Sequence, residues 1–140
     1  MKNDPFLDAS QIVAKIEKLD GVSYALVHGK QIIFHATLPN GITKCICTPK
    51  SRFQASINGY WVDITSVQKD LLDRYGCSYV IFRLEDMRYS VVDWKEISPL
   101  LTSSCMQNND REGDHWKMYI RKGFLEVRKG EKIPINVEQM

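Results

Sequence analysis

The chain has 140 residues, of which 44% are hydrophobic and 26% are charged, and this balance fits one globular domain rather than a disordered or fibrous chain. Its 19 basic and 17 acidic side chains leave a formal net charge of only +2. Composition therefore does not indicate a nucleic-acid-binding protein, and any such binding has to come from a local patch.

No apolar run approaches the roughly 20 residues that span a bilayer, and the first five residues lead into no apolar signal core. The four cysteines are Cys45, Cys47, Cys77 and Cys105, and no C-x-x-C pair typical of a structural zinc site is present. We expect reduced, mostly buried thiols in a cytoplasmic protein that has no membrane partner.

The first third of the chain predicts a helix followed by three antiparallel strands. Asp8 and Gln11 have capping-box spacing, apolar residues follow at helical spacing, and Gly21 marks the stop. The strands are then expected over 22–27, 31–38 and 42–48. A Pro-Asn-Gly turn joins the last two strands as a hairpin.

The rest of the chain predicts a second helix, a buried strand and a small β-meander. The expected elements are a loop over 49–62 with an edge strand near 57–62, a helix over 65–75, strands over 79–82 and 89–92, a short helix after Asp93, a flexible loop over about 102–114 and strands over 115–137. The predicted fold class is α/β (α+β). We expect a single domain over 1–140, with a core over about 8–101 and a C-terminal β extension.

The order helix, three antiparallel strands, helix, strand resembles the core of the restriction-endonuclease-like (PD-(D/E)xK) superfamily, nearest to archaeal Holliday-junction resolvases and Mrr-like nucleases. The hairpin 31–50 occupies the place of that family's PD and (D/E)xK strands. Residues 62–84 are similar to its second helix and following strand, where a Gln, here Gln68, lies near the active site. The resemblance covers about 8–97 and implies an α-βββ-α-β core with a mixed central sheet.

The residues that would cut nucleic acid depart from the family pattern. Such nucleases hold Mg²⁺ with an Asp and a second acid, and a Lys two residues further on helps to activate water. Here the two acid positions fall on Gln31 and Thr48, and only the Lys is kept, as Lys50. An amide and a hydroxyl cannot supply the charge that a hard divalent cation requires. We therefore predict a vestigial site, formed by Gln31, Thr48, Lys50 and Gln68, with no metal and no other cofactor.

A relocated acid would restore a metal site. Glu17 lies on the first helix, where some family members place an additional acid, and Asp63 precedes the second helix. The simpler interpretations are a solvated helix residue for Glu17 and a turn or cap residue for Asp63. If either acid reaches the site, the alternative is an active Mg²⁺-dependent nuclease or resolvase.

Basic residues gather in two places. Lys44, Lys50 and Arg52 flank the vestigial site and are the predicted phosphate contacts. The second group lies on a predicted strand in which polar and apolar residues alternate, with His115, Lys117, Tyr119 and Arg121 on the polar face. The cations Lys122, Arg128, Lys129 and Lys132 continue this face. This group could contact phosphates, but ordinary solvation explains it equally well, because Glu126 and Glu131 dilute the charge.

Other catalytic arrangements are not indicated. His28 and His35 have no spacing that requires contact with a cysteine, so a Cys-His pair is not expected. The leading hypothesis is a subunit that binds nucleic acid or a partner protein without cutting. The alternatives are the metal-dependent nuclease and a pure interaction module, such as a homodimer formed through a sheet edge or exposed aromatic residues.

Overall fold

The computed structural model describes residues 6–111 and 113–140. The prediction that residues 1–5 lead into no signal core falls on residues outside this range. Residue 112, in the predicted loop, also lies outside it. The elements in chain order are α1 (Ala9–Asp20), β1 (Ala25–Leu26), β2 (Ile33–Thr37), β3 (Thr43–Cys47), β4 (Arg52–Gln54), η1 (Ala55–Ile57), β5 (Gly59–Thr65), α2 (Ser66–Asp73), β6 (Cys77–Leu84), β7 (Arg88–Asp93), α3 (Trp94–Ile97), η2 (Ser98–Leu100), η3 (Ser103–Cys105), β8 (Gln107–Asn109), β9 (Gly113–Arg121), β10 (Phe124–Val127), β11 (Lys132–Pro134) and β12 (Glu138–Gln139).

The first sheet is mixed, with the strand order β1-β2-β3-β6-β7-β12. Strands β3 and β6 run parallel, and the other neighbours are antiparallel. In β6, Val80, Ile81 and Phe82 are all fully buried, as a continuous apolar run requires when both faces of a strand are covered. The predicted α/β class with a mixed sheet is confirmed.

The second sheet is antiparallel, with the order β11-β10-β9-β5-β4, and β8 pairs with β9. It joins the predicted C-terminal strands to β5, which was expected only as an edge strand and instead pairs with both β4 and β9. The predicted loop over 102–114 contains η3 and β8, neither of which the polar sequence indicated.

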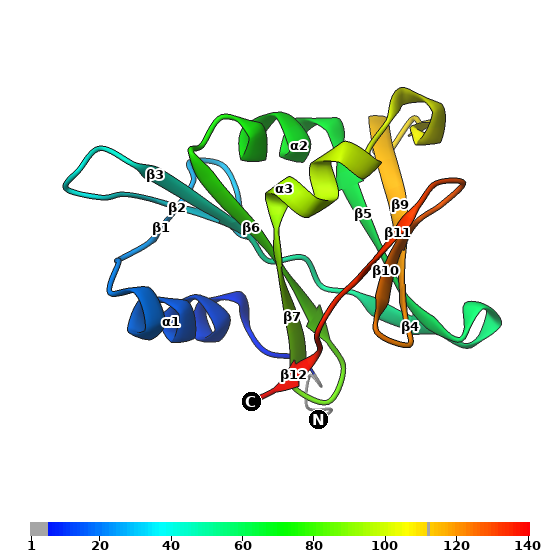
Figure 1. Ribbon diagram of the computed structural model, residues 1–140, viewed down its shortest axis with the longest axis horizontal. Helices are drawn as coiled ribbons and strands as arrows, with labels where there is room; N and C mark the ends of the chain where they lie inside the picture. Colours follow the sequence, from blue (N-terminus) through cyan, green and yellow to red (C-terminus); the bar gives the residue numbers. More distant parts are fainter. Residues whose placement is uncertain (1–5, 112) are drawn as a thin grey trace.

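The main hydrophobic core lies between the two sheets. Figure 1 shows α2 and α3 lying across one side of both sheets and α1 on the first sheet alone. The main core combines Cys45, Phe82 and Leu72 with Met118 and Leu125 of the second sheet. A smaller core under α1 contains Leu7, Ile12, Ile46, Ile81 and Tyr89. The first sheet is therefore covered on both faces, and the second sheet on one.

The predicted signals of α1 lie where that helix begins and ends. The backbone N–H of Asp8 donates to Oε1 of Gln11 at 2.9 Å, and Gly21 adopts a left-handed conformation with φ 72°. At α2, Gln68 Oε1 accepts from the Thr65 N–H at 3.0 Å, and Thr65 Oγ1 accepts from the Gln68 N–H at 3.1 Å. This reciprocal pair is a capping box. Within the described residues, no helix has the length and apolar character needed to cross a lipid bilayer.

The chain crosses from the first sheet to the second between β3 and β4, and Arg83 of β6 holds this crossing. The backbone of Arg83 bonds to Pro49 O and to the Ser51 N–H, both at 2.9 Å. Its guanidinium donates from Nε to Thr48 O at 2.9 Å and from Nη1 to Leu7 O at 3.0 Å. One half-buried side chain thus ties the crossing to the segment that enters α1.

Replacing Arg83 with Met should lower the free energy of unfolding by about 3 kcal/mol, because two backbone carbonyls lose charged hydrogen bonds. Urea denaturation followed by circular dichroism measures this change. Arg128→Met is the matched control, since Arg128 is exposed, and it should stay within about 0.5 kcal/mol of the wild type. Equal midpoints for the two variants would show that Arg83 does not hold the crossing.

Candidate functional site

Two of the four vestigial-site residues meet in one hollow. Gln31, just before β2, and Gln68, in the first turn of α2, line a depression of about 480 Å³ together with Lys30, Thr65 and Arg111. Among the described residues that line it, none is an acid. The donor set therefore consists of amides, a hydroxyl and two cations, which suits an anion better than a divalent metal ion.

Thr48 and Lys50 lie on the other side of the first sheet. Side chains alternate along a strand, so both share the face of Ile46, which packs in the core under α1. Thr48 is fully buried, and its hydroxyl donates to Ile32 O at 2.9 Å. The ammonium of Lys50 lies 4.8 Å from the ring centroid of Phe6. The structure thus brings Gln31 and Gln68 together and separates them from Thr48 and Lys50.

The two candidate relocated acids lie in separate places. Glu17 is in the second half of α1, about 12 Å along the axis from Ala9, and its Oε2 accepts from the Tyr24 N–H at 2.7 Å. Asp63 is in β5 of the second sheet, opposite Lys117. Among residues 6–111 and 113–140, no group of three or more His, Cys, Asp or Glu side chains is placed to hold a metal ion.

His35 and Cys45 are cross-strand partners in the β2–β3 hairpin, but they do not form a nucleophile and its base. Burial raises the pKa of the Cys45 thiol to about 12, and burial also raises the pKa of the Cys47 thiol to about 12. The His35 Nδ1 instead contacts the Tyr75 hydroxyl at 3.1 Å. A thiol that stays protonated is a poor nucleophile.

This burial predicts which cysteines react. In the folded protein at pH 8, iodoacetamide should modify the half-buried Cys77 while Cys45 and Cys47 remain unmodified, because burial both hides these two thiols and suppresses the thiolate. Peptide mass spectrometry of timed samples measures the rates, and labelling in urea is the control in which all the cysteines should react. Labelling of Cys45 as fast as Cys77 without denaturant would contradict the expectation.

The predicted phosphate contacts Lys44, Lys50 and Arg52 do not form one patch. Lys44 pairs with Asp20 at 3.5 Å, near the end of α1. Lys50 is six residues further along extended chain, which corresponds to about 20 Å. Arg52 is exposed on β4 and pairs in register with Trp61, so it belongs to the second sheet.

The outer face of the second sheet gathers cations and aromatic rings. Residues opposite each other in an antiparallel ladder share a face, and the register pairs Trp61 with Tyr119 and Arg121 with Phe124. The partners on the opposite face, such as Val62 and Met118, point into the main core. We call this outer surface the aromatic–basic face. It consists of Arg52, Trp61, Asp63, Lys117, Tyr119, Arg121, Lys122, Phe124, Glu126 and Lys132.

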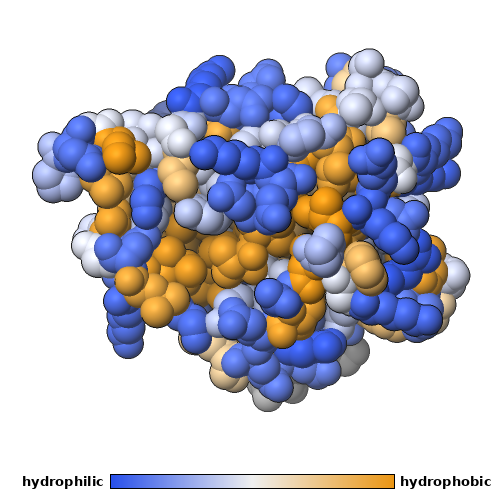
Figure 2. Space-filling model, viewed as in Figure 1, coloured by the Kyte–Doolittle hydropathy of each residue, from blue (hydrophilic) through white to orange (hydrophobic). Residues whose placement is uncertain are grey.

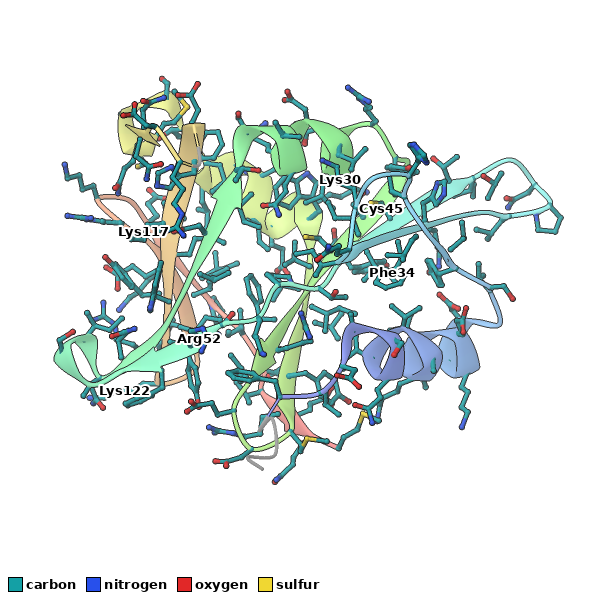
Figure 3. The ribbon with its side chains drawn as sticks, turned by 180° about the vertical axis from the view of Figure 1, so that it is seen from behind. Lys30, Phe34, Cys45, Arg52, Lys117 and Lys122 are labelled. Carbon is teal, nitrogen blue, oxygen red and sulfur yellow. The ribbon has the colours of Figure 1, made fainter. Side chains whose placement is uncertain are left out.

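A cation lies over each of three rings on this face. Lys117 Nζ lies 4.9 Å from the centroid of Trp61, Arg121 Cζ 5.3 Å from that of Tyr119, and Lys132 Nζ 4.7 Å from that of Phe124. These are cation–π distances. Figure 3 shows Lys117, Arg52 and Lys122 along the second sheet, whereas Lys30 and Cys45 lie over the other half of the molecule.

Two adjoining hollows run along the aromatic–basic face. One, of about 460 Å³, is lined by residues that include Asn58, Tyr119 and Phe124. The other, of about 270 Å³, includes Trp61 and Tyr119. Both share Ile57 and Tyr119, so together they form one groove, lined by residues from β4, β5, β9, β10 and β11.

The alternation in 115–121 indicated only part of this surface. It predicted His115 on this face, and the register does place His115 on the same face as Lys117, but His115 is only 2% exposed and its Nδ1 contacts Gly113 O at 2.9 Å. The pattern gave no sign of Trp61 or Phe124, because a local period does not show which distant strands will pair. No protein-family model, no curated protein and no solved structure matches this chain. The chemistry of its surfaces is therefore the basis for a functional proposal.

Proposed function

We propose that this protein is a cytoplasmic nucleic-acid-binding domain that does not cut its ligand and that is built on a nuclease-like core. The observation that carries the proposal is the aromatic–basic face. That face holds five cations and two carboxylates, so its excess of positive charge is larger than the net charge of +2 of the whole chain. Phosphate binding needs clustered Lys and Arg, and aromatic rings add contacts that nucleobases can use.

The order of elements supports the nuclease-like core. The chain runs through α1, then β1, β2 and β3 in antiparallel pairs, and α2 precedes β6, which pairs parallel with β3. Apart from one insertion, this order is similar to that of the restriction-endonuclease-like core that the sequence resembles. The insertion of β4 and β5 between β3 and α2 is a departure from that core.

The donor chemistry supports binding without cleavage. The hollow of Gln31 and Gln68 contains the cations Lys30 and Arg111, and the side-chain oxygens of Gln68 and Thr65 already accept hydrogen bonds in the capping box. Mg²⁺ prefers charged carboxylate oxygens, and a cation beside it would be repelled. The Thr48 hydroxyl is already bonded to a backbone carbonyl on the other face of the sheet. The hollow is therefore suited to a phosphate group.

Charge reversal on the aromatic–basic face should weaken binding. The double variant Lys117→Glu/Lys132→Glu should lose affinity for a labelled oligonucleotide by about tenfold or more, because each lost phosphate contact removes counterion release. Wild-type binding should fall with salt between about 50 and 200 mM, with a log–log slope near −3 for about four neutralised phosphates. Fluorescence anisotropy titrations measure both quantities.

The matched control is Lys18→Glu/Lys95→Glu, which changes the net charge equally at two exposed lysines on α1 and α3. It should bind as the wild type does, and so should Lys50→Ala, because Lys50 lies on the α1 side. Equal losses in both double variants would assign the effect to net charge alone. In the presence of Mg²⁺ or Mn²⁺, the protein should cleave no linear, branched or single-stranded substrate. Cleavage lost in Glu17→Ala or Asp63→Ala would favour the active nuclease.

Dimerisation is the second candidate function, and an apolar surface beside α1 favours it. Ile16, Leu19, Ile81 and Val91 line a hollow of about 180 Å³ there, and the Lys44–Asp20 pair borders it. Leu19 is 75% exposed. Figure 2 shows hydrophobic side chains gathered over the area where α1 meets the first sheet. A surface with apolar residues and both charge signs can match a second copy of itself.

If this surface forms a dimer, sedimentation equilibrium should give twice the monomer mass for the wild type. Leu19→Ser/Val91→Ser should then give the monomer mass, because the apolar contact would be lost. Val67→Ser is the control, since Val67 is equally apolar and exposed but lies on α2. A wild-type monomer at high concentration would remove this candidate and leave nucleic-acid binding untouched.

A further inference from the structure

Three aromatic rings form a row across the second sheet, one from each of three neighbouring strands. Trp61 of β5 lies directly opposite Tyr119 of β9. Phe124 of β10 pairs with Arg121 and is therefore the diagonal neighbour of Tyr119. Neighbouring strands are about 4.8 Å apart, and diagonal side chains about 7–8 Å. The rings are thus spaced more widely than the 3.4 Å step of bases stacked in a duplex strand.

We propose that the aromatic–basic face binds single-stranded nucleic acid, with successive bases stacked on Trp61, Tyr119 and Phe124. The phosphates between them contact Lys117, Lys122 and Lys132. This inference rests on the proposed function and adds to it the class of ligand and the way in which the ligand is held.

The lysine ammonium groups that lie over Trp61 and Phe124 do not prevent stacking. A cation–π contact at an exposed site is worth a factor of about 2 to 5 in an equilibrium constant, and the stacking of one base on an aromatic ring about 5 to 150. On Trp61 and Phe124 a base therefore replaces the ammonium, and the released ammonium moves to a phosphate, whereas Arg121 keeps its place beside Tyr119. The Lys side chain is long and flexible enough for this exchange.

Arg121 differs from the lysines because it is held on two sides. Its Nη2 pairs with Glu126 Oε1 at 2.7 Å, and its Nη1 donates to Ile57 O at 3.2 Å. These bonds fix the guanidinium beside Tyr119 and link β9 to η1, where the groove begins. Arg121 is thus a positioning residue, and Lys117, Lys122 and Lys132 are the cations that contact the ligand.

A single strand uses this surface better than a duplex does. The ring faces of duplex bases are hidden in the stack, and a protein reads the duplex by inserting a helix or a two-stranded ribbon into a groove. The aromatic rings here lie within a sheet face, in a groove with Tyr119 at its centre. A duplex would meet the cations and leave the rings unused, whereas unstacked bases can fill the groove.

An acidic peptide is the main competitor for this face. It would neutralise the same cations, but it would have no flat ring to place on each of three aromatic side chains. The hollow that contains Asn58 also offers an amide that can bond to a base edge. The number and spacing of the rings therefore favour nucleobases.

The test replaces the rings and keeps the charges. Tyr119→Leu and Trp61→Leu retain an apolar side chain but remove the π face. Anisotropy titrations would use labelled dT and dA strands of about 15 nucleotides, a duplex of the same length, and an acidic peptide such as oligoglutamate. Wild type should bind the single strands at least about tenfold more tightly than the duplex, and each variant should lose about tenfold or more for single strands only.

Phe53→Leu is the matched control, because Phe53 is 42% exposed on β4 but pairs with Tyr60 on the opposite face of the sheet. It should bind single strands as the wild type does. Thermal unfolding checks that the variants are folded. Quenching of tryptophan fluorescence by dT strands reports stacking directly and should be lost in Trp61→Leu.

The outcomes separate the two proposals. Equal affinity for single strands and duplex, unchanged by Tyr119→Leu, would overturn the stacking inference and leave nucleic-acid binding in place. No binding to any nucleic acid would overturn both, and binding to the acidic peptide alone would do the same. Loss confined to single strands in the two ring variants, with Phe53→Leu unaffected, would establish the inference.

Discussion

The molecule depends on the hydrogen bonds that Arg83 makes where the chain leaves one sheet for the other. Buried carbonyls need partners, and the guanidinium satisfies those of Thr48 and Leu7 at once. This fixes the path of 48–51, so β4 begins the second sheet beside the main core. The Thr48 hydroxyl serves the same crossing by bonding to Ile32 O.

The crossing divides the surface into regions of different chemistry. The first sheet is covered on both faces, by α1 and by α2 with α3, and its remaining exposed surface beside α1 is apolar. The second sheet is covered on one face only, and its outer face is where cations and rings gather. A chain of nearly neutral net charge can thus present one basic surface, because the charges are distributed by strand register rather than by composition.

Local signals predicted much of the fold. The capping box at Asp8, the hairpin turn and the apolar run in β6 depend on nearby residues, and each lies where it was expected. The pairing of β5 with β9 joins segments about fifty residues apart, and no local period indicates such a contact. For that reason the sequence did not join Trp61 and Phe124 to this surface, and it did not show that His115, on the same face as Lys117, would be buried. The candidate site was predictable only as residue types, since sequence did not show that Gln31 and Thr48 face opposite sides.

The last strand, β12, returns to the first sheet and covers the outer edge of β7. Glu138 and Gln139 pair with Tyr89 and Arg88, and the amide of Met140 donates to Met87 O at 3.2 Å. At the other edge, β1 is only two residues long. An uncovered long strand is a template on which other chains can assemble into aggregates. By pairing with Arg88 and Tyr89, β12 satisfies backbone groups at this edge that would otherwise be open to a strand of another chain.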